Sequence, residues 1–257
     1  MEEGCLEPLV EHMERDKTIG LAQSLLLLYP EKNLVNAAGN AYHYLGFGFC
    51  RQYRTPVNEL TLPSVSDIAY ASGAAVMLRA DLLNHYGLWD KDFFLYHEDL
   101  EYAFRLRIAG YRAILVADSR FYHKYNFNKS IEKFYWMERN RFAVLFLFFR
   151  IPTLILLAPM LLLLEVGLWL FALKNGWWRE RARVYAYWTK KAHWQLWLDK
   201  RRFIQSLRKK SDRELLRFAS PTIWFQETSV TSPLLTYVGN PLMFVYYWLI
   251  VRGLIWW

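Results

Sequence analysis

The sequence predicts an α/β domain followed by an α-helical region that contacts a membrane. Three observations support this prediction. Short apolar segments alternate with helical patterns over the first 141 residues. Two long apolar segments follow, at residues 151–173 and 234–257. Between them, residues 174–217 carry 14 Lys and Arg against 4 Asp and Glu, so the net charge of +8 arises from one block.

The amino-acid composition indicates a protein that has a buried core and contacts lipid. The 257 residues suffice for one large domain or two smaller ones with a buried core. Hydrophobic residues make up 54% and aromatic residues 18%, which is high for a soluble enzyme and suggests contact with lipid. Cys5 and Cys50 have no metal-binding spacing and fit a reducing compartment. The acidic start has no apolar run behind it, so we expect no signal peptide.

The first elements follow from apolar periodicity. Residues 4–16 predict a helix, and residues 18–23 predict a strand that leads into the apolar residues 25–28. Residues 36–53 are rich in Gly and aromatic side chains, and we expect an irregular loop there. This stretch has no GxGxxG or Walker pattern, so a nucleotide site built on it is not supported.

Five consecutive small residues occupy positions 71–75, with Ser72 and Gly73 among them. A strand over residues 76–79 and a short helix over residues 80–86 are expected to follow. Small side chains let a second backbone or a ligand approach the chain closely. A tight crossing of strands explains them equally well, so both interpretations stay open.

A short acidic helix is predicted after the aromatic residues 93–96. Glu98 and Asp99 occupy its first turn, where the helix dipole favours negative charge, and Gly110 is placed to end it. Acidic capping alone would explain the pair. The side chains expected to pack inward are spaced as in a helix, at Leu100, Ala103, Phe104 and Ile108.

Two further groups of polar residues follow this helix. A strand over residues 111–116 leads to His123, which we expect to return toward Glu98 and Asp99 and which would then be a reasonable metal ligand. A helix begins near Ser130 and carries the run Glu138–Arg141. Its arginines, Arg139 and Arg141, either bind a phosphate bidentately or anchor the chain at an interface, and both readings stay open.

The second half of the chain predicts membrane contact. Residues 151–173 contain one charged residue, Glu165, and are long enough to cross a bilayer, although Pro152 and Pro159 should bend or interrupt the helix. A full crossing would separate the basic block from the first domain, against the positive-inside rule. We therefore favour residues 142–173 as a hairpin in the cytoplasmic leaflet.

The remaining segments complete this arrangement. Residues 174–233 are expected to form a basic amphipathic region on the membrane surface, because Lys and Arg alternate with Trp between two apolar segments. Residues 234–257 form a second apolar segment that ends in two tryptophans. Nucleic acid also attracts such basic and aromatic mixtures, but the apolar flanks make it the weaker partner. We expect no nucleic-acid partner.

Several motifs, taken together and in order, resemble those of family 2 glycosyltransferases, the inverting enzymes of the GT-A fold. The resemblance covers about residues 4–141. Within the family, the chain is most similar to bacterial transferases that add rhamnose or a similar sugar to lipid-linked cell-surface polysaccharide. The motifs are Ala71–Leu78, Gly87–Phe94, His97–Tyr111, His123 and Glu138–Arg141.

The resemblance implies a fold and a set of roles. Residues 1–141 would be the C-terminal part of a GT-A domain, with Asp99 as the catalytic base and Glu98 orienting it or the acceptor. His123 would hold a divalent metal, Mg²⁺ or Mn²⁺. The substrates would be a nucleotide sugar and a lipid-linked saccharide, at the cytoplasmic face of the cell membrane. The substrate-binding residues would be Ser72, Gly73, His97, Arg139 and Arg141.

One departure from the family is large. The nucleotide-binding half that ends in an Asp-x-Asp metal motif has no counterpart here, since Asp90-Lys91-Asp92 matches only by letters and lies in the acceptor-side turn. The sequence therefore looks N-terminally truncated, with little activity expected of the chain by itself. One alternative is a non-enzymatic membrane scaffold. Another is a metal-dependent hydrolase that uses His97, Glu98, Asp99 and His123.

Overall fold

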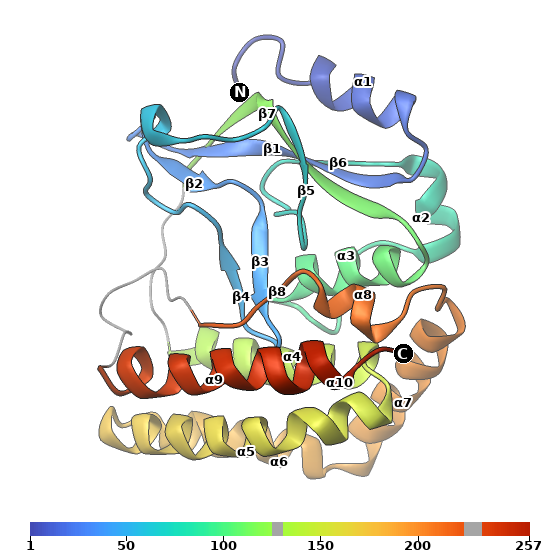
Figure 1. Cartoon of the computed structure of the whole chain (residues 1–257). Helices are drawn as coiled ribbons and strands as arrows, with labels where there is room; N and C mark the ends of the chain where they lie inside the picture. The colour runs from blue at the N-terminus through green and yellow to red at the C-terminus, as the bar shows by residue number, and fades with distance from the viewer. Residues whose placement is uncertain (125–130, 224–232) are drawn as a thin grey trace.

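Two long parallel strands form the centre of the structure, a computed structural model that describes residues 1–124, 131–223 and 233–257 (Figure 1). Strand β1 (Ile19–Leu28) pairs with β7 (Arg112–His123) along almost its whole length. All ten residues of β1 are buried. This burial is expected of a parallel strand that is covered on both faces.

Shorter strands extend this pair into a curled mixed sheet. Both β2 (Val35–Ala37) and β6 (Val76–Leu78) pair antiparallel with β1, and β5 (Val65–Asp67) pairs antiparallel with β7. A second sheet has the order β4-β3-β8. Its strands are β3 (Asn40–His43), β4 (Gly48–Cys50) and β8 (Ala219–Ser220).

Helices cover the two faces of the main sheet. Helix α1 (Glu7–Arg15) lies on one face, where Leu9 and Met13 pack with Ile19 and Ile114. Helix α3 (Glu98–Ile108) lies on the other face, below the sheet in Figure 1. From Leu100 onward every side chain of α3 is buried, so its first turn sits at the border of the core. Two short elements, η1 (Val57–Glu59) and α2 (Ala80–Tyr86), lie in the connections.

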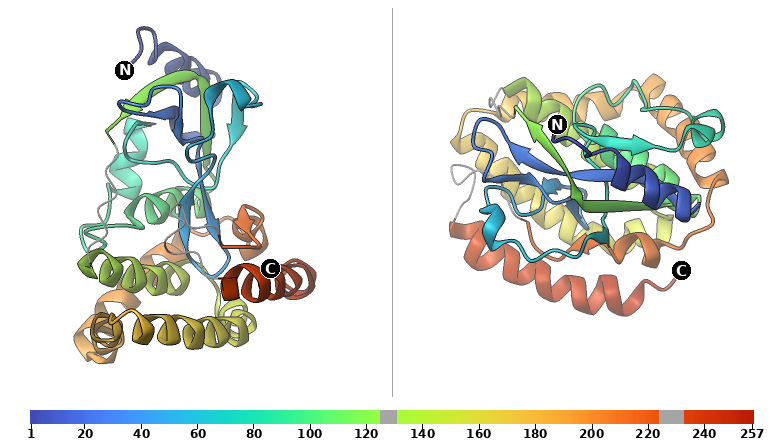
Figure 2. Two further views of the ribbon diagram at one scale, coloured as in Figure 1. Left: turned by 90° about the vertical axis from the view of Figure 1, so that its left-hand side faces the viewer. Right: turned by 90° about the horizontal axis from the view of Figure 1, so that it is seen from above.

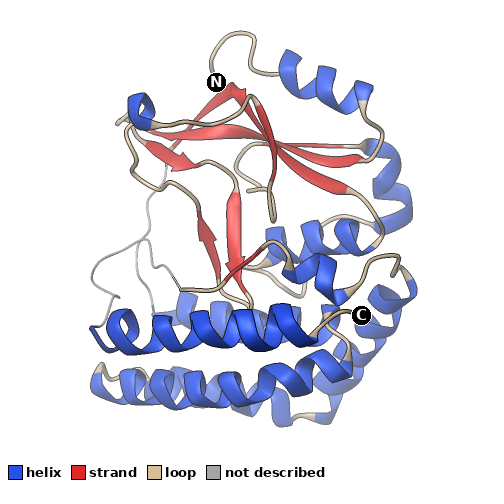
Figure 3. Ribbon diagram, viewed as in Figure 1, coloured by secondary structure: helices blue, strands red, loops and turns tan. Residues whose placement is uncertain are grey.

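A layer of helices lies on the far side of α3 from the sheet, as Figures 2 and 3 show. Its first part consists of α4 (Ile131–Phe148), α5 (Ile151–Lys174), α6 (Trp178–Thr189), α7 (Lys191–Ser206) and α8 (Asp212–Leu216). Its C-terminal part consists of η3 (Leu235–Gly239), α9 (Asn240–Tyr246), η4 (Tyr247–Val251) and α10 (Arg252–Leu254), of which η3 and η4 are π-helical. This part lies beside α5, where the Tyr246 hydroxyl donates a hydrogen bond to the Leu156 carbonyl at 2.6 Å.

Most of the predicted elements are confirmed, with two corrections. The helices predicted at residues 4–16 and 80–86 and after residue 97 are α1, α2 and α3. The irregular loop predicted for residues 36–53 is wrong, because it contains β3, β4 and the end of β2. The strand predicted for residues 111–116 is too short, since β7 continues to His123.

The prolines do not interrupt the apolar helix, which corrects one of the two effects predicted for them. Pro152 lies in the first turn of α5, where a missing N–H costs nothing, and the helix continues past Pro159 to Lys174. Residues 142–149, which precede α5, were expected to form part of a hairpin in the membrane, and the structure places them differently. Most side chains at residues 143–149 are buried in the protein core, because this end of α4 packs beneath α3.

Candidate active site

The carboxylate of Asp99 is fixed by a donor on each oxygen. Oδ2 accepts a hydrogen bond from the Gly73 backbone N–H at 2.8 Å, and Oδ1 accepts one from Trp89 Nε1 at 2.9 Å. A Cβ atom at residue 73 would lie 2.7 Å from Oδ1, so only glycine allows this approach. Gly73 is exposed and Asp99 is partly buried, so the held carboxylate lies at the border between the core and the surface.

The small residues at 71–75 are tied to the central sheet at the same point. The Ser72 N–H donates to Oε1 of Gln23 at 2.8 Å, and Gln23 is a fully buried residue of β1. The Ser24 N–H donates to the Ala75 carbonyl at 3.3 Å. The segment therefore runs along β1 on one side and against Asp99 on the other. Close backbone packing explains the small residues here, and Ser72 and Gly73 lie beside the predicted base.

The carboxyl group of Glu98 has a strongly raised pKa. Burial, the largest cause, and the neighbouring Asp99 together raise its pKa to about 7, against a hydrogen bond from its own backbone N–H that lowers it. Burial also raises the pKa of Asp99, against the hydrogen bonds from Gly73 and Trp89. Within the described ranges, Oε2 of Glu98 is buried without a hydrogen-bond partner. Glu98 can therefore exchange a proton near neutral pH.

This shift predicts a pH-dependent stability. The unfolded chain releases the Glu98 proton near pH 4.5 and the folded protein near pH 7, so the folded state binds more protons in between and stability falls as the pH rises. We expect the Glu98→Gln variant to lack this fall. Discounted for partial exposure, the wild-type protein should lose about 1–3 kcal/mol more than the variant between about pH 5 and pH 8. Urea unfolding at both pH values measures this loss, and parallel changes in the two proteins would contradict it.

His97 precedes the two acids and contacts a different part of the chain. Its Nε2 lies 2.9 Å from the Gly46 carbonyl oxygen, which only accepts hydrogen bonds, so Nε2 carries the hydrogen. Burial lowers the pKa of His97 to about 4, and the ring is therefore neutral at pH 7. Nδ1 then carries a lone pair, which is buried and has no hydrogen-bond partner in residues 1–124, 131–223 and 233–257. Binding of substrate by His97 stays a prediction.

His123 ends β7, where its Nδ1 hydrogen-bonds with Oδ1 of Asn36 at 2.9 Å. In the part of the chain that the structure describes, no three His, Cys, Asp or Glu side chains lie together as metal ligands would. These residues therefore do not assemble a divalent-metal site by themselves, and no step below depends on one. The role of His123 as a ligand stays a prediction.

The arginines of the Glu138–Arg141 run are held by the protein interior. Arg139 Nη2 donates to the Asp92 carbonyl, and the guanidinium lies over the Trp136 ring at 4.4 Å from the centroid. Arg141 is fully buried between Glu138 Oε2 at 2.9 Å and Glu165 Oε1 at 2.5 Å. These contacts give both side chains a structural role. Substrate binding by either arginine stays a prediction.

The whole chain matches a known protein family. A family model described as glycosyl transferase family group 2 matches residues 1–257. The chain belongs to this family. The mixed α/β architecture with its curled sheet fits a GT-A type fold. A glycosyltransferase uses a nucleotide-sugar donor and an acceptor, and the residues around Asp99 are the candidates for handling them. No curated protein matches the chain.

Sequence patterns assigned no role to three residues that position the candidate active site of this glycosyltransferase. Trp89 binds Asp99, Gln23 holds Ser72, and Asn140 contacts the segment before Glu98. A weak signal existed for Asn140, which lies inside the Glu138–Arg141 run, and for Trp89, which lies inside the Gly87–Phe94 motif. The two aspartates of the Asp90-Lys91-Asp92 turn have a structural role, because the carboxylates of both bind Lys200 of α7.

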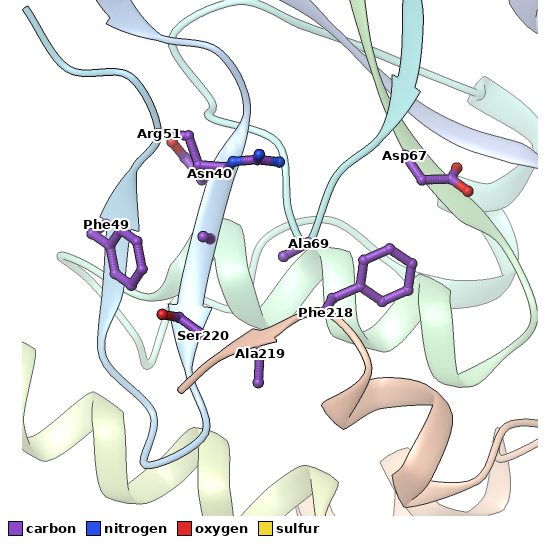
Figure 4. Close-up of a pocket in the computed structure, with 9 residues that line it drawn as sticks. Asn40, Phe49, Arg51, Asp67, Ala69, Phe218, Ala219 and Ser220 are labelled. Atoms are coloured by element: carbon purple, nitrogen blue, oxygen red, sulfur yellow. The ribbon is translucent and has the colours of Figure 1, made fainter. Parts of the chain in front are cut away.

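A cavity elsewhere in the glycosyltransferase does not coincide with the carboxylates. It has a volume of about 270 Å³ and lies between β3, β4 and the chain leading into β8 (Figure 4). Asn40, Phe49, Asp67 and Phe218 line it, and none of the predicted site residues does. The carboxylates, and not this cavity, mark the candidate active site.

Proposed function

We propose that this glycosyltransferase moves a sugar from a nucleotide-sugar donor to a lipid-linked or polysaccharide acceptor, with inversion, in cell-surface polysaccharide synthesis. The family assignment supports glycosyl transfer. One observation supports the site. Asp99 is held on both carboxylate oxygens at the exposed end of α3, next to Glu98 with a pKa near 7.

The proposed reaction uses Asp99 as a general base. The acceptor hydroxyl attacks the anomeric carbon of the donor on the face opposite the nucleoside diphosphate, and a new carbon–oxygen bond forms as the bond to the diphosphate oxygen breaks. The hydroxyl proton passes to Asp99, and the bond electrons leave with the diphosphate. A carboxylate suits this step because the hydroxyl becomes acidic as it attacks. The neighbouring Glu98 orients the acceptor.

The helical layer supports a site at the cytoplasmic face of the cell membrane. In the described parts of the chain, α5 is the helix long and apolar enough to cross a bilayer, and only 11% of its most apolar stretch is buried. The C-terminal helices beside α5 expose further apolar side chains, which a soluble core helix would not do. We call these exposed side chains the apolar face; they include Ile155, Leu162, Val166, Leu170, Val238, Val245, Trp248 and Leu249.

Charge and aromatic residues complement the apolar face. Lys190 and Lys191 are exposed at the junction of α6 and α7. Trp194 is exposed in the first turn of α7, and Trp178 is exposed at the other end of α6. A helix that lies in the membrane interface combines an apolar side with basic and tryptophan side chains in this way. We therefore propose that α5 lies along an anionic cytoplasmic leaflet, where a lipid-linked acceptor would be presented to the protein.

The transfer reaction is tested with the purified chain, a panel of UDP-, GDP- and dTDP-sugars, and lipid-linked saccharides as acceptors. In keeping with the little activity expected of the chain by itself, we expect slow release of nucleoside diphosphate that depends on the acceptor, and a product whose anomeric configuration by NMR is opposite to that of the donor. Absence of both donor binding and diphosphate release across the panel would contradict the proposal. A product that retains configuration would contradict the single-displacement step.

Membrane docking is tested separately by flotation. The chain should float with vesicles that contain phosphatidylglycerol, and less with vesicles of phosphatidylcholine alone, because the basic block binds anionic lipid. A chain that stays at the bottom of the gradient with both vesicles would contradict the membrane assignment and leave the transfer reaction as a separate question.

A further inference from the structure

We propose that Asn140 is a positioning residue that holds the segment before Glu98 and Asp99 in the conformation that presents both carboxylates. Its consequence for catalysis rests on the proposed function, whereas its action on this segment does not. We call residues 93–97 the presenting segment. It connects the turn that carries Trp89 to the first residue of α3.

The presenting segment has a strained backbone. The φ angles of Phe94, Tyr96 and His97 are 57°, 64° and 66°. They lie in the left-handed region, which residues other than glycine rarely adopt. Such residues keep this conformation only where the surrounding structure holds them in it. His97 is also the residue before the first turn of α3, and its side chain does not cap the helix. The start of α3 therefore depends on contacts that come from elsewhere in the chain.

Asn140 supplies these contacts from α4. Its side-chain nitrogen donates to the carbonyl oxygens of Phe93 at 2.8 Å, Leu95 at 2.9 Å and Tyr96 at 2.7 Å. The side chain is completely buried, so water cannot replace it. Three carbonyl oxygens that converge on one point repel each other unless a donor lies between them. The amide group has two hydrogens for three acceptors, so one hydrogen is shared.

The orientation of the Asn140 amide follows from its neighbour. Arg139 Nε donates to Oδ1 of Asn140 at 2.9 Å, and a guanidinium has donors only. Oδ1 must therefore face Arg139, and the nitrogen must face the presenting segment. Arg139 also contacts the Phe93 carbonyl at 3.4 Å. The two side chains together bind the beginning of the segment.

The same turn of α4 reaches the other end of the segment. Arg141 Nη1 donates to the Leu45 carbonyl at 3.3 Å, and the next carbonyl, that of Gly46, accepts the hydrogen bond from His97 Nε2. Arg141 is itself fixed to α5 through Glu165. Asn140 thus acts from a turn that is anchored on both sides, which suits a group that has to hold strained backbone.

Hydrogen exchange measured by mass spectrometry tests the positioning role in the full chain. In the Asn140→Ala variant, a peptide that covers residues 93–101 should exchange at least roughly tenfold faster than in the wild type. Val144→Ala is the matched control, because Val144 lies one turn further along α4, is 1% exposed and packs in the apolar core. It should leave the exchange of this peptide unchanged.

Kinetics test the catalytic consequence. Loss of Asn140 should lower kcat at least roughly tenfold and leave the KM for the donor within about twofold, since the fully buried Asn140 has no surface that a donor could contact. Unchanged exchange at residues 93–101, or an equal increase in Val144→Ala, would overturn the positioning role. A wild-type chain that transfers no sugar, combined with the expected exchange result, would overturn only the proposed function.

A second variant keeps the test decisive if Asn140→Ala does not fold. Asn140→Ser retains one shorter donor, so it should increase exchange at residues 93–101 while exchange in the central strands β1 and β7 stays at the wild-type level. A uniform increase over the whole chain would show a general loss of stability and would overturn the proposal.

Discussion

The Asp99→Asn variant should lose roughly a hundredfold to ten-thousandfold in kcat and remain folded. The amide cannot take the proton of the acceptor hydroxyl, so the attacking oxygen would have to lose it to water. The KM for the donor should change little, because Asp99 acts on the acceptor. Folding should be retained at a cost of about 1–3 kcal/mol, because the amide nitrogen cannot accept one of the two hydrogen bonds that Gly73 and Trp89 donate. Initial rates of diphosphate release and a thermal unfolding curve measure both effects.

Asp118→Asn is the control for this prediction. Asp118 lies on β7 and is exposed, so removal of its charge changes the net charge of the chain without touching the site. Its kcat should stay at the wild-type value. Equal losses in the two variants, or transfer by Asp99→Asn at more than about a tenth of the wild-type rate, would show that another group accepts the proton.

The Arg141→Met variant should lose about 3–5 kcal/mol in free energy of unfolding. Arg141 belongs to a buried cluster in which Arg141 and Arg181 bind Glu138 and Glu165, two positive charges with two negative ones. Methionine fills a similar volume but leaves the carboxylates with one guanidinium between them. The uncompensated charge has no water to solvate it, because Glu138 is 2% exposed. Denaturant unfolding measures the loss.

Arg183→Met is the matched control. Arg183 pairs with Glu180 at 2.5 Å on the surface of α6, and 60% of its side chain is exposed. An exposed pair of this kind contributes at most about 1 kcal/mol. The contrast between the two arginines isolates burial as the cause. Similar losses in both variants would show that the cluster is better solvated than its burial indicates.

The acidic helix was predictable because its signals are local. Glu98 and Asp99 fall in the first turn and Gly110 follows the last turn, so no distant contact is needed to find α3. The apolar spacing predicted a single buried side, whereas the structure buries every side chain from Leu100 onward, because the tertiary fold covers the polar side as well. The strands β3 and β4 were missed because each is only three or four residues long in a Gly-rich stretch. Strand β3 is completed by β8, which comes almost at the other end of the chain.

The supports of the site could not be derived from sequence spacing. Gln23, Trp89 and Asn140 reach the site from a strand, a turn and a helix that only the tertiary fold brings together. The structural role of Arg141 was missed for a related reason. Charges next to an apolar segment usually face an interface, but its partner Glu165 lies inside that apolar segment. The single acid in residues 151–173 was the available clue.

The position of Glu165 also bears on how α5 could meet a membrane. The acid lies in the middle of α5 and binds Arg141 of α4 and Arg181 of α6. An apolar helix with an unpaired carboxylate enters a bilayer core at a high cost. Both ion pairs keep this carboxylate on the side of α5 that faces the protein. The proposed docking along a leaflet therefore places no uncompensated acid in the lipid.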